Sequence, residues 1–237
     1  MGMPLEAQAR RQGRGGIRSS QTLDRGLRVL EALAQEPAGL TVTELAQRVG
    51  THRTNVYRLL ATLAQHRLVR RGSDGRYLLG TGLVDLVRAV AADLRTAALP
   101  VLAELAEKVR ATAFLTLADG EEAVALAVVE PRRTHMHVAY RVGFRHPISR
   151  GASGLAILAG RPPQPGERPE VAAARRLGYS VTQGELQPGA SGIAAPICIG
   201  GRPAEASVGV VTMGELDVSA VAPHVLAAAQ AIADALT

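Results

Sequence analysis

The sequence predicts an α+β protein with two domains: a small helical N-terminal domain that ends in a hairpin, and a larger C-terminal domain of mixed α/β type. Three observations favour this fold class. The 237 residues suffice for two domains near the lower part of the usual size range. Apolar residues recur at helical spacing in the first third of the chain and form short, strand-like runs after it. The excess positive charge is confined to the first third.

The chain opens with residues 1–19, which are polar, rich in glycine and contain four arginines. We expect this segment to be disordered in the free protein. It is interpreted either as a basic arm that touches phosphates or the minor groove of DNA, or as a solvated tail. A first helix is predicted from Thr22 to Gln35, where four apolar residues repeat at helical spacing and form its packed face: Leu23, Leu27, Leu30 and Ala34.

The stretch from Leu40 to Leu79 predicts two short helices and a hairpin. Thr41 and Glu44 fit a capping box at the start of the first of these helices, and Gly50 supplies the left-handed residue that ends it. The second helix has one apolar face, which is formed by Val56, Leu59, Leu60 and Leu63. The hairpin turns around Ser73–Gly75. This order is typical of a winged helix-turn-helix, in which the second helix enters the major groove of DNA with its N-terminus first.

The polar residues of this stretch are the candidates for contacts with double-stranded DNA. Arg53, Thr54 and Asn55 lie at the start of the second helix and are expected to read base edges. Four arginines of that helix and of the hairpin are expected mainly to hold phosphates: Arg58, Arg70, Arg71 and Arg76. The DNA-binding set is completed by Thr43, His52 and Tyr57.

The distribution of charge agrees with a DNA-binding N-terminal part. Residues 1–82 contain 13 arginines against 6 acidic residues, whereas the rest of the chain contains 14 basic and 15 acidic residues. Positive charge attracts phosphates without regard to base sequence. The charge therefore supports binding to nucleic acid but does not predict a particular DNA site.

A linker helix is predicted between the two domains. Gly80–Gly82 is a natural break after the hairpin, and residues 83–95 then place five apolar side chains on one stripe: Leu83, Leu86, Val87, Val90 and Leu94. This stripe is interpreted as core or, at least as well, as a surface that covers a partner protomer. Another helix is predicted from Leu99 to Val109, with Pro100 at the favoured first-turn position. The predicted segments are thus 1–19, 20–80, 81–98 and 99–237.

The C-terminal domain alternates predicted strands and helices. Two buried strands are joined by a hairpin around Asp119-Gly120. The predicted strands are 113–118, 124–129, 136–140, 179–182, 192–199 and 206–212. The predicted helices are 153–159, 170–177 and 218–236. This architecture is typical of a domain that senses a small molecule.

The sequence nominates no catalytic residue, cofactor or metal site, and we predict that the protein is not an enzyme. His135 and His137 share one face of a predicted strand, but a metal would need a third ligand that the sequence does not nominate. Cys198 lies in an apolar run and is expected to be a buried core thiol. The stretch Gly151–Gly154 lacks the second glycine of a nucleophile elbow; as a loop entering a helix, it can instead bind an anion such as a carboxylate.

The cellular location is predicted from cysteine usage and hydropathy. The single cysteine excludes an internal disulfide and fits a reducing compartment. No apolar run approaches 18 residues and no charged-then-apolar segment opens the chain. We therefore expect a soluble cytoplasmic protein without a membrane partner.

Several stretches give the chain a resemblance to a known family. In the N-terminal part they are Arg25–Leu30, Leu40–Ala46, Asn55–Leu63 and Gly75–Gly80; in the C-terminal part they are the small-residue turn Gly151–Ala159 and the Gly-Glu…Ala-Ala-Pro segment Gly184–Pro196. In this order and spacing they resemble the isocitrate lyase regulator (IclR) family of bacterial transcription factors, from Ser20 to Leu236.

The resemblance implies a winged helix-turn-helix, a linker helix used in dimer contacts, and a C-terminal GAF-like effector domain. It also implies a homodimer, or a homotetramer built as a dimer of dimers, that binds an operator. The effector would be a small organic or aromatic acid, and its carried-over contacts are Ala152, Ser153, Thr182, Gly192, Gly209 and Val211. The function expected is a transcriptional regulator, a repressor rather than an activator, controlled by a carboxylate-bearing effector. The alternative is a DNA-binding regulator whose C-terminal domain only oligomerises.

Overall fold

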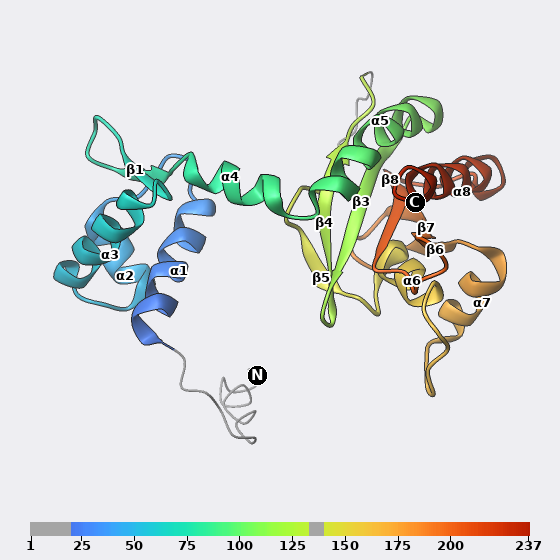
Figure 1. Ribbon diagram of the computed structural model, residues 1–237, viewed down its shortest axis with the longest axis horizontal. Helices are drawn as coiled ribbons and strands as arrows, with labels where there is room; N and C mark the ends of the chain where they lie inside the picture. The colour runs from blue at the N-terminus through green and yellow to red at the C-terminus, as the bar shows by residue number, and fades with distance from the viewer. Residues whose placement is uncertain (1–19, 133–139) are drawn as a thin grey trace. The chain divides into compact units, whose positions relative to one another are not determined.

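The computed structural model of the protein describes residues 20–132 and 140–237. The chain divides into two compact units, which meet in sequence between Val90 and Ala91 (Figure 1). The expectations for the arm at 1–19 and for the strand at 136–140, Tyr140 excepted, lie outside the described residues, as do His135 and His137.

The N-terminal unit is a three-helix bundle with a small hairpin. Its elements are α1 (Gln21–Ala34), α2 (Val42–Val49), α3 (Arg53–Gln65), β1 (Val69–Arg71), β2 (Tyr77–Leu79) and α4 (Gly82–Ala89). The two strands pair antiparallel, with Val69 opposite Leu79. The core lies between α1, α2 and α3 and is built from aliphatic side chains, among them Val29, Leu45 and Leu60. These elements confirm the winged helix-turn-helix arrangement.

Local sequence signals set the boundaries of α2 as predicted. Thr41 is the N-cap, and its side chain accepts a hydrogen bond from the Glu44 amide while the Glu44 carboxylate accepts one from the Thr41 amide. Gly50 ends the helix at φ 68°, in the left-handed region that glycine adopts without steric cost. The capping box and the glycine stop are therefore both confirmed.

The buried face of α1 differs from the prediction. Leu23 and Leu27 are 62% and 51% exposed, and the helix buries Gly26, Val29 and Leu33 instead. Both stripes have helical spacing, so periodicity alone could not tell which of them faces α2 and α3. The correction leaves two exposed leucines one turn apart on α1.

The linker also differs from the prediction, because the break between the two helices lies at residues 90–91 and not at residues 96–98. The chain leaves helical geometry at Val90 and Ala91, the latter with φ 43°, and α5 then runs from Ala92 to Val109. Pro100 consequently lies inside α5 and not in its first turn. An interior proline removes one backbone hydrogen bond. Ala98 and Leu102, on either side of it, are fully buried.

The C-terminal unit is a six-stranded antiparallel sheet with helices on both faces. Its strands are β3 (Thr112–Asp119), β4 (Glu122–Val129), β5 (Arg145–Pro147), β6 (Ser180–Gln183), β7 (Ala190–Ile197) and β8 (Ala206–Met213). Their spatial order is β5-β4-β3-β8-β7-β6. The helices, besides α5, are α6 (Gly151–Ala159), α7 (Pro169–Leu177) and α8 (Val218–Asp234). The hairpin around Asp119-Gly120 is confirmed.

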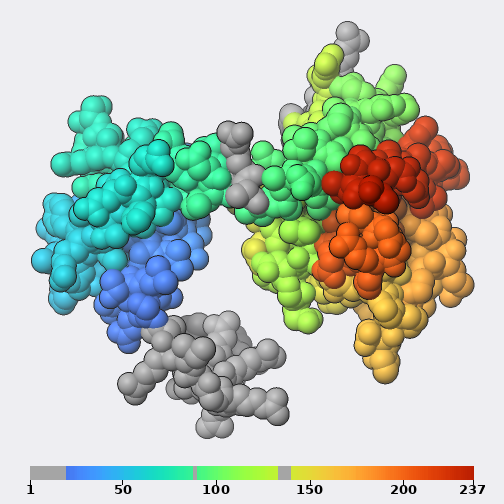
Figure 2. All heavy atoms as spheres, in the orientation of Figure 1, coloured from blue at the N-terminus to red at the C-terminus, as the bar shows by residue number. Residues whose placement is uncertain are grey.

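The two faces of this sheet carry side chains of different kinds. Helices α5 and α8 lie side by side on one face (Figures 1 and 2), where the strands bury aliphatic residues such as Leu115, Ile193 and Val208. Helix α6 covers the other face and contacts β3, β6, β7 and β8, and α7 packs against α6. Because side chains alternate along a strand, the α6 face receives the intervening residues, many of them small or polar.

One row on the α6 face depends on a glycine. Phe114 of β3 lies opposite Gly209 of β8, which in turn lies opposite Ala194 of β7. A Cβ atom at Gly209 would approach the Ile193 carbonyl oxygen to 2.3 Å and the Phe114 ring to 2.7 Å. The missing side chain at residue 209 therefore makes room for the phenylalanine ring.

We predict that Gly209→Ala lowers the free energy of unfolding of the C-terminal unit by about 1–3 kcal/mol, because the added methyl group overpacks this row. Gly192→Ala is the matched control, since its new Cβ would meet no atom closer than 3.5 Å. Urea denaturation followed by circular dichroism measures both variants. Equal losses of unfolding free energy in Gly209→Ala and Gly192→Ala would contradict the packing explanation.

Candidate DNA-binding surface and ligand cavity

Helix α3 presents a polar surface at its N-terminal end. His52, the N-cap residue, is exposed, and so are Arg53, Thr54 and Arg58. Tyr57 is also exposed, although it is a large side chain. The opposite face of the same helix buries Val56 and Leu60 in the core of the unit, and this burial fixes which side of α3 faces outward.

Two predicted DNA contacts are less accessible. Asn55 is half-buried, and its side-chain amide donates a hydrogen bond of 3.2 Å to the Thr51 hydroxyl in the turn before α3. Thr43 is half-buried in the first turn of α2. Their assigned roles stay predictions, and the Asn55 contact indicates that this side chain also holds the turn between the two helices.

The hairpin forms the wing, and two of its three arginines project from it. Arg70 and Arg71 on β1 are exposed. The Arg71 guanidinium lies 5.8 Å from the centre of the Tyr77 ring, a distance at which a cation and an aromatic face attract each other. Both arginines can reach an anion outside the unit.

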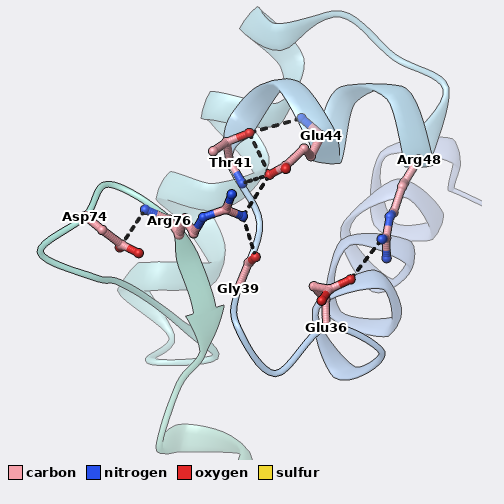
Figure 3. A network of polar contacts seen from close by, with 7 residues as sticks. All are labelled: Glu36, Gly39, Thr41, Glu44, Arg48, Asp74 and Arg76. Carbon is pink, nitrogen blue, oxygen red and sulfur yellow. Dashed lines mark hydrogen bonds and ion pairs between the residues drawn. The ribbon is translucent and has the colours of Figure 1, made fainter.

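Arg76, the third arginine of the hairpin, is half-buried and braces the wing against α2 (Figure 3). Its Nη1 donates to the Gly39 carbonyl oxygen at 2.9 Å and to Glu44 Oε2 at 3.1 Å. Hydrogen bonds from the Thr41 backbone and side chain, together with the Arg76 charge, hold the pKa of Glu44 below its usual value. The phosphate contact assigned to Arg76 stays a prediction, but this guanidinium already has an internal structural role.

A cavity of about 300 Å³ lies between α6 and the sheet of the C-terminal unit. Its size is at the lower end of the usual range for small-molecule sites. Five of the six predicted effector contacts line it: Ala152, Ser153, Thr182, Gly192 and Val211. The register explains this grouping, because Thr182, Gly192 and Val211 form one continuous row across β6, β7 and β8.

The sixth predicted effector contact, Gly209, is not among the residues that line the cavity. It lies one row away from Val211, beneath the Phe114 ring. Gly209 was carried over from the family resemblance, which does not specify the side chain that packs against this position. In this chain the phenylalanine, and not the glycine, reaches the cavity.

Three aromatic side chains that the sequence analysis missed form one wall of the cavity. Phe114, Tyr140 and Phe144 line it, with ring centres 5.0 Å apart for the first pair and 5.3 Å apart for the second. Composition could have drawn attention to them, because the chain contains only two phenylalanines and no tryptophan. Aromatic residues that are this rare, and meet at one place, indicate a site for a flat apolar ligand.

The rim is formed by the loop between β6 and β7, which adds Glu185, Leu186 and Gln187, and by Ala190 at the start of β7. Glu185 accepts a hydrogen bond of 2.8 Å from the Gly151 amide at the start of α6. It also accepts two from Arg168, at 2.9 and 3.3 Å. Hydrogen bonding to Arg168 lowers the pKa of Glu185, so this carboxylate is ionised at neutral pH.

A chain of buried polar groups lies behind the aromatic wall. His146 Nδ1 is 3.0 Å from the Pro147 carbonyl oxygen, and its Nε2 is 3.1 Å from the Ser153 hydroxyl. Burial lowers the pKa of His146, so the ring is neutral at pH 7. Burial raises the pKa of Tyr140, while hydrogen bonds with Thr116 and Ser153 oppose that shift.

Cys198 is exposed directly after β7, so the expectation of a buried core thiol was wrong; the strand ends one residue earlier, at the buried Ile197. Within the described residues, histidines, cysteines and acidic side chains form no group of three that could hold a metal ion. No described helix is both long and apolar enough to cross a membrane.

Comparison with protein-family models gives two matches, in the order of the two units. Residues 22–73 match the model of the IclR helix-turn-helix domain. Residues 88–168 match the model described as bacterial transcriptional regulator IclR C-terminal. Together the two matches cover more than half of the chain.

Curated relatives are named for the regulation of transcription and not for catalysis. The chain is 35% identical over 152 residues to an HTH-type transcriptional regulator of Mycobacterium tuberculosis, which covers 63% of this chain and 57% of the relative. It is 27% identical over 202 residues to the regulator KipR of Bacillus subtilis, covering 75% and 80% of the two chains. The match therefore spans little more than half the length of the first of these relatives.

Among solved structures, the chain is similar to an IclR homolog of Microbacterium hydrocarbonoxydans crystallised in complex with 4-hydroxybenzoate. The TM-score is 0.81 at 26% identity, over 91% of this chain and 98% of the other. The two family models, the named relatives and this likeness agree with one another. The chain belongs to the IclR family of bacterial transcriptional regulators.

Proposed function

We propose that the protein is a sequence-specific DNA-binding regulator whose C-terminal unit senses a small aromatic molecule. The observation that carries this proposal is the pairing of two features on one chain: the exposed polar end of α3 beside an arginine-bearing wing, and a cavity lined by aromatic side chains. A compartment that holds the chromosome is required for such a function, so we propose a cytoplasmic location.

The exposed residues of the N-terminal unit divide into two roles toward DNA. Arg53 and Thr54 lie in the first turn of α3, the part of a recognition helix that meets base edges in the major groove. Arg58, Arg70 and Arg71 are exposed cations that suit phosphate oxygens, which carry no sequence information. His52 and Tyr57 border the same surface.

The cavity supports effector sensing over the alternative of a C-terminal unit that only oligomerises. A unit that served oligomerisation alone would gain stability by filling an internal space, because voids forfeit packing contacts. Here a space of about 300 Å³ is kept open by small residues such as Ala152 and Gly192. The bound 4-hydroxybenzoate of the similar Microbacterium structure agrees with an aromatic ligand.

Exposed apolar side chains in the N-terminal unit support a homo-oligomer. Val84, Leu86, Val87 and Val90 are each about half exposed or more, and all lie on or directly after α4. Leu23 and Leu27 add a second apolar pair on α1. Exposed apolar patches of this kind mark protein contacts, so we propose a homodimer or a dimer of dimers.

We favour repression of transcription over activation, because a repressor needs only to occupy its operator.

The assigned roles predict different losses for two arginine substitutions. Arg53→Ala should cost about 1–3 kcal/mol on the operator and little on random DNA, because a base contact is lost. Arg70→Ala should weaken binding to both DNAs alike and reduce the salt dependence by about one phosphate contact. Selection from a random duplex library supplies the operator, and fluorescence anisotropy at several salt concentrations measures the affinities.

Arg202→Ala serves as the control for these two variants. It removes the same charge from the C-terminal unit, at an exposed position, and should change neither affinity. The assignment of roles is wrong if Arg53→Ala and Arg70→Ala lose the same affinity on operator and on random DNA.

The brace in Figure 3 predicts that Arg76 stabilises the wing. Strand β2 pairs with the segment before α2 through reciprocal hydrogen bonds between Leu40 and Tyr77. Arg76→Ala should speed hydrogen exchange at these two amides, because its contacts to Gly39 and Glu44 lie beside them. Arg70→Ala, which removes an equal charge from the same hairpin at an exposed position opposite Leu78, should leave this exchange unchanged. Equal hydrogen-exchange rates at the Leu40 and Tyr77 amides in the two variants would show that the Arg76 contacts do not hold the wing.

A further inference from the structure

We propose that the cavity selects an uncharged aromatic molecule that carries a hydrogen-bond donor, and discriminates against the corresponding carboxylate. This inference rests on the proposed ligand-sensing function and narrows it to one chemical class. It departs from the carboxylate-bearing effector expected from the family resemblance. It rests on the charge of the lining, the direction of its hydrogen bonds and the shape of its wall.

The first step concerns charge. Among the described residues that line the cavity, Glu185 is the one charged side chain, and it is an anion. Two groups that would suit a ligand carboxylate are already bound to Glu185. The Gly151 amide at the start of α6 and the Arg168 guanidinium both donate to the Glu185 carboxylate. A carboxylate ligand would therefore be desolvated beside a like charge without a cation of its own.

The second step concerns the direction of the hydrogen bonds. A carbonyl oxygen only accepts, so His146 donates its Nδ1 proton to Pro147, and the Nε2 of this neutral ring must accept from Ser153. The Ser153 oxygen consequently acts as an acceptor toward the cavity and toward Tyr140. The Gln187 amide donates one N–H to the Met213 sulfur, 3.6 Å away, which leaves its second N–H as a donor and its carbonyl oxygen as an acceptor.

These polar groups and Glu185 make the lining rich in acceptors. A ligand carboxylate brings only further acceptors, so it would offer no donor to the Ser153 oxygen or to the Glu185 carboxylate. A phenol hydroxyl or a carboxamide brings donors that match Ser153, Gln187 or Glu185. The hydrogen-bond pattern thus favours the same class of ligand as the charge.

The third step concerns shape. The rings of Phe114, Tyr140 and Phe144 are inclined to one another by 48° and 54°, and they form a continuous apolar wall. Small residues on the sheet and on α6, such as Gly192 and Ala152, leave space opposite that wall. A single substituted benzene ring fits this arrangement, with the ring against the aromatic side chains and the polar group toward the acceptors.

The test compares 4-hydroxybenzamide with 4-hydroxybenzoate, which have nearly the same shape and differ in charge. Calorimetric titration of the full chain at pH 7.5 should show that the amide binds about 10- to 100-fold more tightly, as expected for a charged group left without a partner. If 4-hydroxybenzoate bound as tightly as 4-hydroxybenzamide, or more tightly, the proposed preference would be overturned and the ligand-sensing function would stand. Binding of neither compound, in protein that still binds its selected operator, would overturn both.

Variants test which residue sets this preference. Glu185→Gln should bring the affinities for the two compounds closer together. It should strengthen the binding of 4-hydroxybenzoate, because the negative charge of the Glu185 carboxylate is removed. Glu205→Gln is the matched control: this glutamate is exposed, pairs with Arg161 and does not line the cavity, so the ratio should stay the same. An unchanged ratio in Glu185→Gln would overturn the role given to that carboxylate.

A second pair of probes tests the need for a donor without any change of charge. 4-Methylphenol should bind more tightly than its methyl ether, because the ether has lost the only hydrogen-bond donor. Equal affinity of the two compounds would overturn the second step of the proposal.

Discussion

Alternation of side chains along β3, β7 and β8 is the constraint on which the C-terminal unit depends. Each strand sends aliphatic residues to the face covered by α5 and α8, and small or polar residues to the face covered by α6. Small residues cannot fill the space beneath a helix, so a hollow remains there. Gly209 leaves room for the Phe114 ring in one row, and that ring becomes part of the cavity wall. The alternation therefore gathers the small residues and the aromatic ring that form the site on the face covered by α6.

The N-terminal unit separates the residues that hold its shape from those that face outward. Glu44 joins the capping box of α2 to the wing through Arg76, and Asn55 ties the start of α3 to the turn before it. These polar side chains act inside the unit, whereas Arg53, Arg70 and Arg71 remain exposed. Helix-turn-helix surfaces need such internal supports, because base recognition requires side chains held at fixed positions.

Features determined by neighbouring residues could be predicted from the sequence, and features determined by distant partners could not. The capping box at Thr41, the stop at Gly50 and the hairpin at Asp119-Gly120 are local, and all are present. The break at Val90 was missed because the apolar spacing continues across it, and the exposure of Leu23 was missed because a second stripe on α1 has the same period. The family resemblance placed five of six residues at the cavity. It did not predict the aromatic wall, because the three residues of that wall come from separate segments of the chain.

The central claim is that occupation of the cavity changes how the chain binds DNA. A ligand can do so only by the difference between its affinities for the DNA-bound and free proteins. The most direct test is the dissociation constant for the selected operator, measured by fluorescence anisotropy with and without saturating 4-hydroxybenzamide. The account predicts a change of about 5- to 150-fold, the usual range for coupled sites. An unchanged dissociation constant, at a ligand concentration that calorimetry shows to be saturating, would contradict it.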